Sequence, residues 1–152
     1  MSRQIRVGID PAFRKKGFAM CIIDTEHTAK FKIFNSFLDF VTWSLHDRPE
    51  NAIWIIENSN LQAKCWQKNA MSVGKNQAAS QYTVDFLKAL ECEVYEISPL
   101  QKGKVWPNSI FQNAVYVDKN ILIDFKGTED ERCAYQLATR NISIMKNLKN
   151  VN

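Results

Sequence analysis

Apolar and polar positions follow a strand-like pattern in the first part of the chain and later change to helical spacing. The segments 4–10, 17–24 and 29–35 are short, apolar or alternating, and bounded by turn residues, so they predict three strands joined by hairpins. The run AIWIIEN at 52–58 is apolar throughout and predicts a strand buried on both faces. CEVYEIS at 92–98 predicts a fifth strand.

Four other segments carry apolar residues at helical spacing: 36–46, 75–90, 108–117, and a last one from Thr128 or Glu129 to about Leu148. Ser36 suits the N-cap of the first helix, and Thr128 with Glu131 has capping-box spacing. The predicted inward residues are Phe37, Phe40, Val41 and Leu45, then Ala79, Tyr82, Val84, Phe86, Leu87 and Leu90, and finally Ala134, Leu137, Ala138, Ile142 and Ile144. The order of elements predicts one α/β domain over 1–152. Its mixed five-stranded sheet would begin as an antiparallel meander, continue with parallel strands and be flanked by helices.

Length and composition fit a domain with a real core, since 45% of the 152 residues are hydrophobic. No apolar run approaches the roughly 20 residues of a membrane span, and the N-terminal segment does not resemble a signal peptide. We therefore expect a cytoplasmic protein of a bacterial or phage-infected cell, without a membrane partner. The cysteines are scattered and form no C-x-x-C pair, which argues against a zinc site.

Two predicted strands end on carboxylates, Asp10 and Glu57. If these strands are neighbours and parallel, their ends meet at one edge of the sheet, and the last helix adds Glu129, Asp130 and Glu131 at its start. Clustered carboxylates repel one another unless a cation neutralises them, and hard oxygen ligands suit Mg²⁺ or Mn²⁺. Two such ions can activate water and stabilise a leaving oxygen in phosphodiester cleavage. Taken singly, each acid is more often a turn former or a partner of the helix dipole.

Five stretches occur in a recognisable order: VGIDPAFRKKGFA, IWIIEN, VGKNQAASQ, YEISPLQKGK and TEDERCAYQLATR. Together they resemble the motifs of RuvC-like Holliday junction resolvases (crossover junction endodeoxyribonucleases) of the RNase H-like superfamily. The resemblance covers roughly residues 4–145 and implies the RNase H-like fold. The first motif also occurs in ATPases of this fold, but that branch needs further phosphate-binding glycine loops and a larger chain, which this sequence lacks.

The resemblance implies a set of metal ligands. Asp10 and Glu57 match the ligands of the first and fourth strands, and Asp130 matches the first acid of the last helix. The second acid of that helix, three residues on, is Cys133 here, which departs from the family pattern. A thiolate is a soft ligand and a poor match for Mg²⁺. Glu131 or Glu129 is a candidate to compensate.

The implied activity is divalent-metal-dependent cleavage of branched DNA, above all of the four-way junction, with Mg²⁺ or Mn²⁺, two ions being expected. One alternative is an RNase H-like nuclease that acts on an RNA–DNA hybrid or a flap. Another is a junction-binding protein whose catalysis is weakened by Cys133. Replacement of Cys133 by Asp separates this last alternative from the first reading.

Basic residues surround the expected site, and the net charge of +4 with a pI near 8.9 is a mild indication of a polyanionic partner. Each lysine taken alone is more often just solvated, and Trp66 is as often a core residue as a base-stacking one. The expected DNA-binding residues are Arg14, Lys15, Lys16, Lys64, Trp66, Lys68, Lys75, Lys102 and Lys104.

A second subunit is also expected, because a four-way junction offers two symmetric strands to cut. In resolvases the helix matching 75–90 lies near the two-fold axis. Ala78, Ala79, Tyr82 and Phe86 are the candidate contacts of a homodimer. The competing interpretation is that this helix simply packs on its own sheet.

Overall fold

The sheet of the protein has six strands. A computed structural model describes residues 4–11, 18–61 and 70–140, with side chains except in 70–76. The strands are β1 (Ile5–Asp10), β2 (Phe18–Ile23), β3 (Thr28–Phe34), β4 (Ala52–Glu57), β5 (Glu93–Ile97) and β6 (Ile121–Ile123), and they lie in the order β5-β4-β1-β2-β3-β6. Strands β1 to β3 form the predicted antiparallel meander, and β4 and β5 continue it in parallel on the other side of β1.

The prediction of five strands was wrong by one. Strand β6 pairs in parallel with β3 at the edge of the sheet. It is only three residues long and its side chains are largely exposed, so it has no periodic pattern from which a strand is predicted.

The helices are α1 (Phe37–Asp47), α2 (Ala70–Ala89), α3 (Pro99–Lys102), α4 (Asn108–Asp118) and α5 (Glu129–Ala138), with one 3₁₀ turn, η1, at Ser59–Leu61. The predicted caps of α1 and α5 are confirmed, because the Ser36 side chain accepts from the Asp39 amide and Thr128 forms a capping box with Glu131. Helix α5 ends at Ala138, well short of the predicted end near residue 148. Ile142 and Ile144 lie outside the described residues. None of the helices in the described ranges is both long and apolar enough to cross a membrane.

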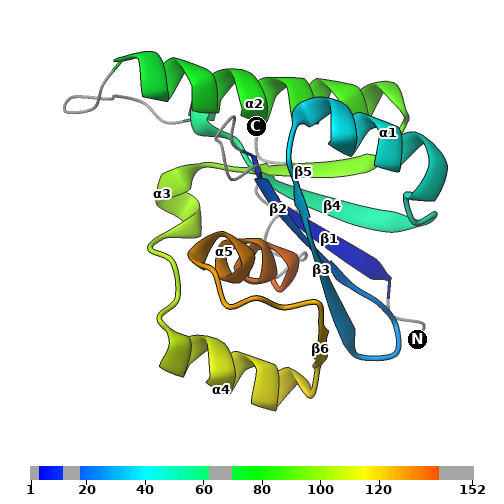
Figure 1. The fold of residues 1–152 in the computed structure, drawn as a ribbon, viewed down its shortest axis with the longest axis vertical. Helices are drawn as coiled ribbons and strands as arrows, with labels where there is room; N and C mark the ends of the chain where they lie inside the picture. Colours follow the sequence, from blue (N-terminus) through cyan, green and yellow to red (C-terminus); the bar gives the residue numbers. More distant parts are fainter. Residues whose placement is uncertain (1–3, 12–17, 62–69, 141–152) are drawn as a thin grey trace, which may run out of the picture.

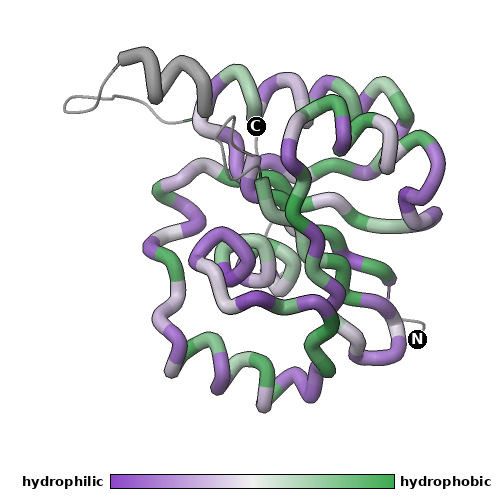
Figure 2. The backbone as a smooth tube through the Cα atoms, viewed as in Figure 1, coloured by the Kyte–Doolittle hydropathy of each residue, from purple (hydrophilic) through white to green (hydrophobic). Residues whose placement is uncertain are grey.

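The helices cover both faces of the sheet (Figure 1). Helices α1 and α2 lie on one face. The core between these helices and the sheet is built on Phe18, Phe34, Phe40, Trp54 and Leu87. Helix α5 lies on the other face and packs with α4 around Phe31, Phe111, Ala134, Tyr135 and Ala138. Figure 2 shows that the hydrophobic stretches of the backbone gather in the central strands, while hydrophilic residues predominate on the outer turns.

Two residues predicted to face inward are exposed. Leu45 of α1 and Tyr82 of α2 are 54% and 56% exposed. In α1 the core position belongs instead to Ser44, one turn after Phe40, because a helix on a sheet buries only one stripe of its surface. The Tyr82 ring extends the aromatic cluster outward, with its centroid 6.1 Å from that of Phe37.

Helix α5 lies unusually close to the middle of β1, at Gly8. A Cβ atom at Gly8 would lie 2.0 Å from the backbone oxygen of Ala134 and 2.6 Å from the backbone nitrogen of Ala138. Glycine is therefore required because the helix backbone occupies the space of a side chain. This contact fixes the position of α5 relative to the end of β1, where Asp10 lies.

Candidate active site

The site lies at the edge of the sheet where three neighbouring strands end. Strands β1 and β4 are parallel, and their register pairs Ile9 with Ile56, so Asp10 and Glu57 each follow the paired residues by one position. Strand β5 is parallel to β4 and leads directly into α3. The sequence-based expectation that the first and fourth strands are adjacent and parallel is confirmed. The carboxyl ends of parallel strands are the usual position of a binding site in such folds.

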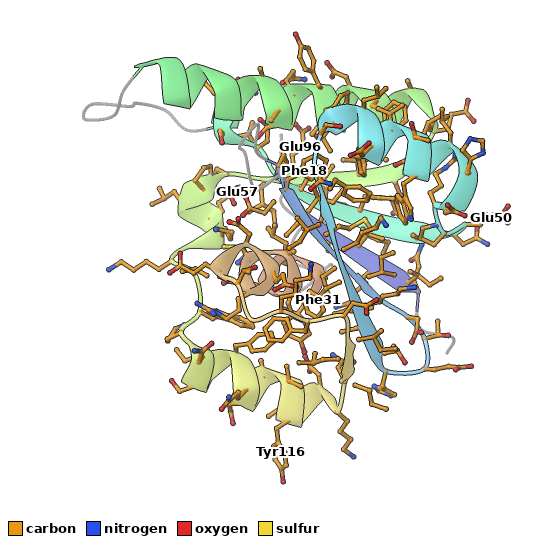
Figure 3. All side chains as sticks on the ribbon, in the orientation of Figure 1. Phe18, Phe31, Glu50, Glu57, Glu96 and Tyr116 are labelled. Atoms are coloured by element: carbon orange, nitrogen blue, oxygen red, sulfur yellow. The ribbon has the colours of Figure 1, made fainter. Side chains whose placement is uncertain are left out.

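Lysine 102 connects this edge to α5. Its ammonium nitrogen Nζ lies 3.2 Å from Oε2 of Glu57 and 3.2 Å from Sγ of Cys133. The side chains of Lys102 and Glu57 are 10% and 14% exposed, so this ion pair is largely shielded from water. Figure 3 shows Glu57 between α3 and α5, consistent with these contacts. Sequence analysis placed Lys102 on a DNA-binding loop, whereas in the structure its side chain turns into the carboxylate cluster.

The charges of these groups influence one another. Burial by itself lowers the pKa of Lys102. The negative charge of Glu57, followed by Cys133 and Asp10, raises this pKa and together outweighs burial, so the pKa lies above its ordinary value. Burial, reinforced by the negative charge of Asp10, raises the pKa of the Cys133 thiol to about 11, although Lys102 opposes this rise. Asp10 is therefore close enough to act electrostatically on both groups. The thiol keeps its proton at neutral pH.

Two side chains of α5 that the sequence analysis missed hold the C-terminal end of α3, where Lys102 lies, and the loop that follows it. Gln136 donates from Nε2 to the carbonyl oxygens of Lys102 (3.0 Å) and Lys104 (3.2 Å) and accepts from the amide of Trp106. Arg132 donates to the carbonyl oxygen of Trp106 at 3.0 Å. Arg132 and Gln136 lie one turn apart on α5, and buried side chains of this kind need several polar partners. That spacing is the sequence signal that could have indicated their contacts.

The backbone around Glu57 is held from the other side of the sheet. Ser80 of α2 donates from Oγ to the carbonyl oxygen of Glu57 at 3.2 Å. The next residue, Asn58, is buried, and its amide nitrogen Nδ2 donates to Glu96 at 2.6 Å. Glu57 is thus fixed by its own strand, by α2 and by Lys102.

The three acids at the start of α5 differ in their surroundings. Glu131 is fully buried, and its carboxylate accepts from the amides of Lys126 and Thr128 and from the Thr128 hydroxyl. These contacts assign the Glu131 carboxylate to the helix cap. Glu129 is exposed. Asp130 is partly exposed and lies one turn before Cys133, so both residues face the same side of the helix.

Most of the expected DNA-binding residues lie outside the described part of the chain: Arg14, Lys15, Lys16, Lys64, Trp66 and Lys68. Lys75 belongs to α2, where only the backbone is described. Lys104 is exposed on the loop after α3, beside the site. It is the expected DNA contact that the structure places at the surface.

The carboxylates at this edge of the sheet determine which metal ion the site can hold. Among the described residues, no group of three or more His, Cys, Asp or Glu side chains is arranged to hold a metal ion. Mg²⁺ needs fewer protein ligands than that, because it is commonly held by one or two carboxylates together with water and substrate phosphate. Asp10 and Glu57, at neighbouring strand ends, fit this requirement for one ion.

The comparison with solved structures gives a consistent picture of the fold. A structure of T. thermophilus RuvC in complex with a Holliday junction substrate matches with a TM-score of 0.60 and 10% sequence identity over 90% of each chain. A structure of Thermus thermophilus RuvC matches with a TM-score of 0.50 and 12% identity, over 88% of this chain and 90% of that one. No protein-family model matches this sequence, and neither does any curated protein. The chain therefore has a fold similar to that of RuvC over most of its length.

Proposed function

We propose that this protein is a divalent-metal-dependent, structure-selective endonuclease that cleaves branched DNA, with the four-way (Holliday) junction as its substrate. One observation carries the proposal: Asp10, Glu57 and Lys102 gather where β1, β4 and β5 end. They do so in a fold similar to that of a RuvC bound to such a junction. Carboxylates that gather at neighbouring strand ends repel one another, and such groups of interacting charges are common at functional sites.

Asp10, Glu57 and Asp130 are the proposed ligands of Mg²⁺ or Mn²⁺, because carboxylate oxygens are the hard donors that these ions prefer. A bound ion of this kind supplies water activation and neutralises charge on the reacting phosphate. Arg132 and Gln136 act as positioning residues, since they fix the C-terminal end of α3, from which Lys102 reaches the carboxylates, and the loop that follows it.

Two further parts of the proposal concern DNA and a second subunit. Lys104 and the basic residues outside the described ranges would bind phosphates, an interaction that weakens as salt rises. A homodimer would place two sites on one junction, and the exposed Tyr82 of α2 is its candidate contact. Ala79 is buried, and it therefore packs within its own subunit.

The test is cleavage of an end-labelled four-way junction with Mg²⁺ or Mn²⁺, beside duplex, flap, single-stranded and RNA–DNA hybrid substrates. We expect paired, symmetric nicks that disappear in Asp10→Asn. The matched control is Asp124→Asn, which makes the same change at an exposed acid in the turn after β6 and should cut normally.

The other outcomes separate the alternatives. Preferred cutting of the hybrid or the flap would replace the junction by another nuclease substrate. Tight junction binding without nicks, converted to cutting by Cys133→Asp, would indicate a junction-binding protein whose site is weakened by the thiol. Equal binding and no cutting of all substrates would refute the proposal and leave only the fold.

A further inference from the structure

Lys102 is a fixed group rather than a mobile surface lysine. Its amide donates to the carbonyl oxygen of Ser98, its carbonyl oxygen accepts from Gln136, and α3 is closed at its start by a Ser98–Gln101 capping box. The ammonium lies between a carboxylate of β4 and a thiol of α5. The cation therefore occupies a defined position that is set from both ends of the side chain.

This position conflicts with a second metal ion. In sites with two metals the ions lie about 3.5–4 Å apart and share ligands. Here the Lys102 ammonium lies 3.2 Å from Oε2 of Glu57, so one oxygen of that carboxylate already faces a cation. The other oxygen, Oε1, is the ligand atom left for a metal. On the far side of the ammonium lies Cys133, whose sulfur is a weak acceptor and a poor ligand for Mg²⁺.

The charges give the same result. Asp10 and Glu57, the two carboxylates that act on Lys102, carry two negative charges, and Lys102 carries one positive charge. A single divalent ion already more than balances the remaining charge of about −1. A second divalent ion would add two more positive charges and would have to lie next to the largely shielded ammonium of Lys102.

We propose that the site binds one divalent cation, at Asp10 and Glu57, and that the Lys102 ammonium, held by Glu57 and Cys133, takes the place of the second cation. This inference rests on the proposed metal-dependent function and deepens it, because it replaces the expectation of two ions by one ion and a lysine. Lys102 then supplies fixed positive charge to the reacting phosphate group.

The test counts bound ions directly. Mn²⁺ bound per chain is measured by electron paramagnetic resonance, on the free protein and on its complex with a four-way junction. The Asp10→Asn/Glu57→Gln double variant serves as the blank that subtracts Mn²⁺ bound elsewhere. We expect one Mn²⁺ per chain in the natural sequence and two in Lys102→Gln/Cys133→Asp, which removes the ammonium and adds a carboxylate.

Two control variants separate the effect of the charge at position 102 from that of a surface charge. Lys30→Gln removes the same charge at an exposed position of β3 and should still bind one ion. Lys102→Arg keeps the charge and should also bind one. Circular dichroism and thermal melts establish that each variant is folded. As a second readout, the cleavage rate should rise with the first power of Mn²⁺ concentration in the natural sequence and with a higher power in Lys102→Gln/Cys133→Asp.

The ion counts distinguish failure of the one-ion inference from failure of the proposed nuclease function. Two ions in the natural sequence would overturn the inference while leaving the metal-dependent nuclease intact. One ion in the natural sequence and still one in Lys102→Gln/Cys133→Asp would show that Lys102 does not exclude a second ion. No specific Mn²⁺ in any variant, together with no cleavage, would overturn the inference and the proposed function together.

Discussion

The close contact between α5 and β1 at Gly8 makes Gly8→Ala the most informative single substitution for the architecture of the site. The added methyl group would lie 2.0 Å from the Ala134 oxygen and 2.6 Å from the Ala138 nitrogen, while ordinary contacts begin near 3.4 Å. Both obstacles are backbone atoms, so no side-chain rotation relieves them. Helix α5 has to move away from the sheet, and the buried contacts of Ala134, Leu137 and Ala138 loosen with it.

The magnitude follows from two opposing effects. Replacement of a glycine by alanine within a strand normally stabilises a protein by about 0.5–1 kcal/mol, because the unfolded chain loses freedom. Overpacking against a rigid backbone costs typically 1–3 kcal/mol and occasionally more. Since the clash is with two backbone atoms, we expect overpacking to cost about 3–4 kcal/mol, above the typical range, which leaves a net loss of about 2–3.5 kcal/mol in the free energy of unfolding.

The assay is urea denaturation followed by tryptophan fluorescence, to which the buried Trp54 contributes. Gly127→Ala is the control, because nothing lies within 4 Å of its added methyl group, although its φ of +90° makes alanine strained there. We expect that control to lose only about 1 kcal/mol. A Gly8→Ala protein as stable as the natural sequence would refute the close packing of α5 on β1, and with it the placement of Cys133 beside Lys102.

Three further predictions concern the cap, the clamp and the pH dependence. Glu131→Gln removes charge-assisted hydrogen bonds at a fully buried cap, so the free energy of unfolding should fall by about 2 kcal/mol, which thermal and urea denaturation measure; an unchanged value would contradict the capping role. Gln136→Ala frees the C-terminal end of α3, where Lys102 lies, so the single-turnover cleavage rate should fall by roughly tenfold or more while junction affinity stays within about twofold; an equal loss of both would indicate a general structural defect. Stability should fall as pH rises above about 9, because Cys133 and Tyr135 hold their protons in the folded state up to pKa values of about 11 and about 12, whereas the unfolded chain releases them near 9.0 and 10.0. Cys133→Ser should flatten the pH 9–11 part of that decline in urea melts, and an unaltered curve would exclude the thiol as its source.

Local pattern was sufficient for much of the fold. The apolar run at 52–58 predicted a strand buried on both faces because nothing polar interrupts it, and β4 is such a strand. The capping residues Ser36 and Thr128 were predictable because an N-cap depends on residues only three positions apart. Strand β6 was missed because three residues give no period. Tyr82 was placed inside because an aromatic ring at helical spacing does not reveal which side of the stripe meets the sheet.

The sequence by itself determined that two strands end on Asp10 and Glu57 and that a helix opens with acids, because these facts depend on residue order and local spacing alone. Only the tertiary structure decided which of these groups act together. The register of β1 with β4 brings the ends of both strands to one edge, and the approach of α5 at Gly8 brings Cys133 there. Glu131 contacts the backbone before α5, and the position of α3 places the Lys102 ammonium on Glu57. Contacts between residues far apart in the chain depend on how the layers pack, and no local pattern contains that information.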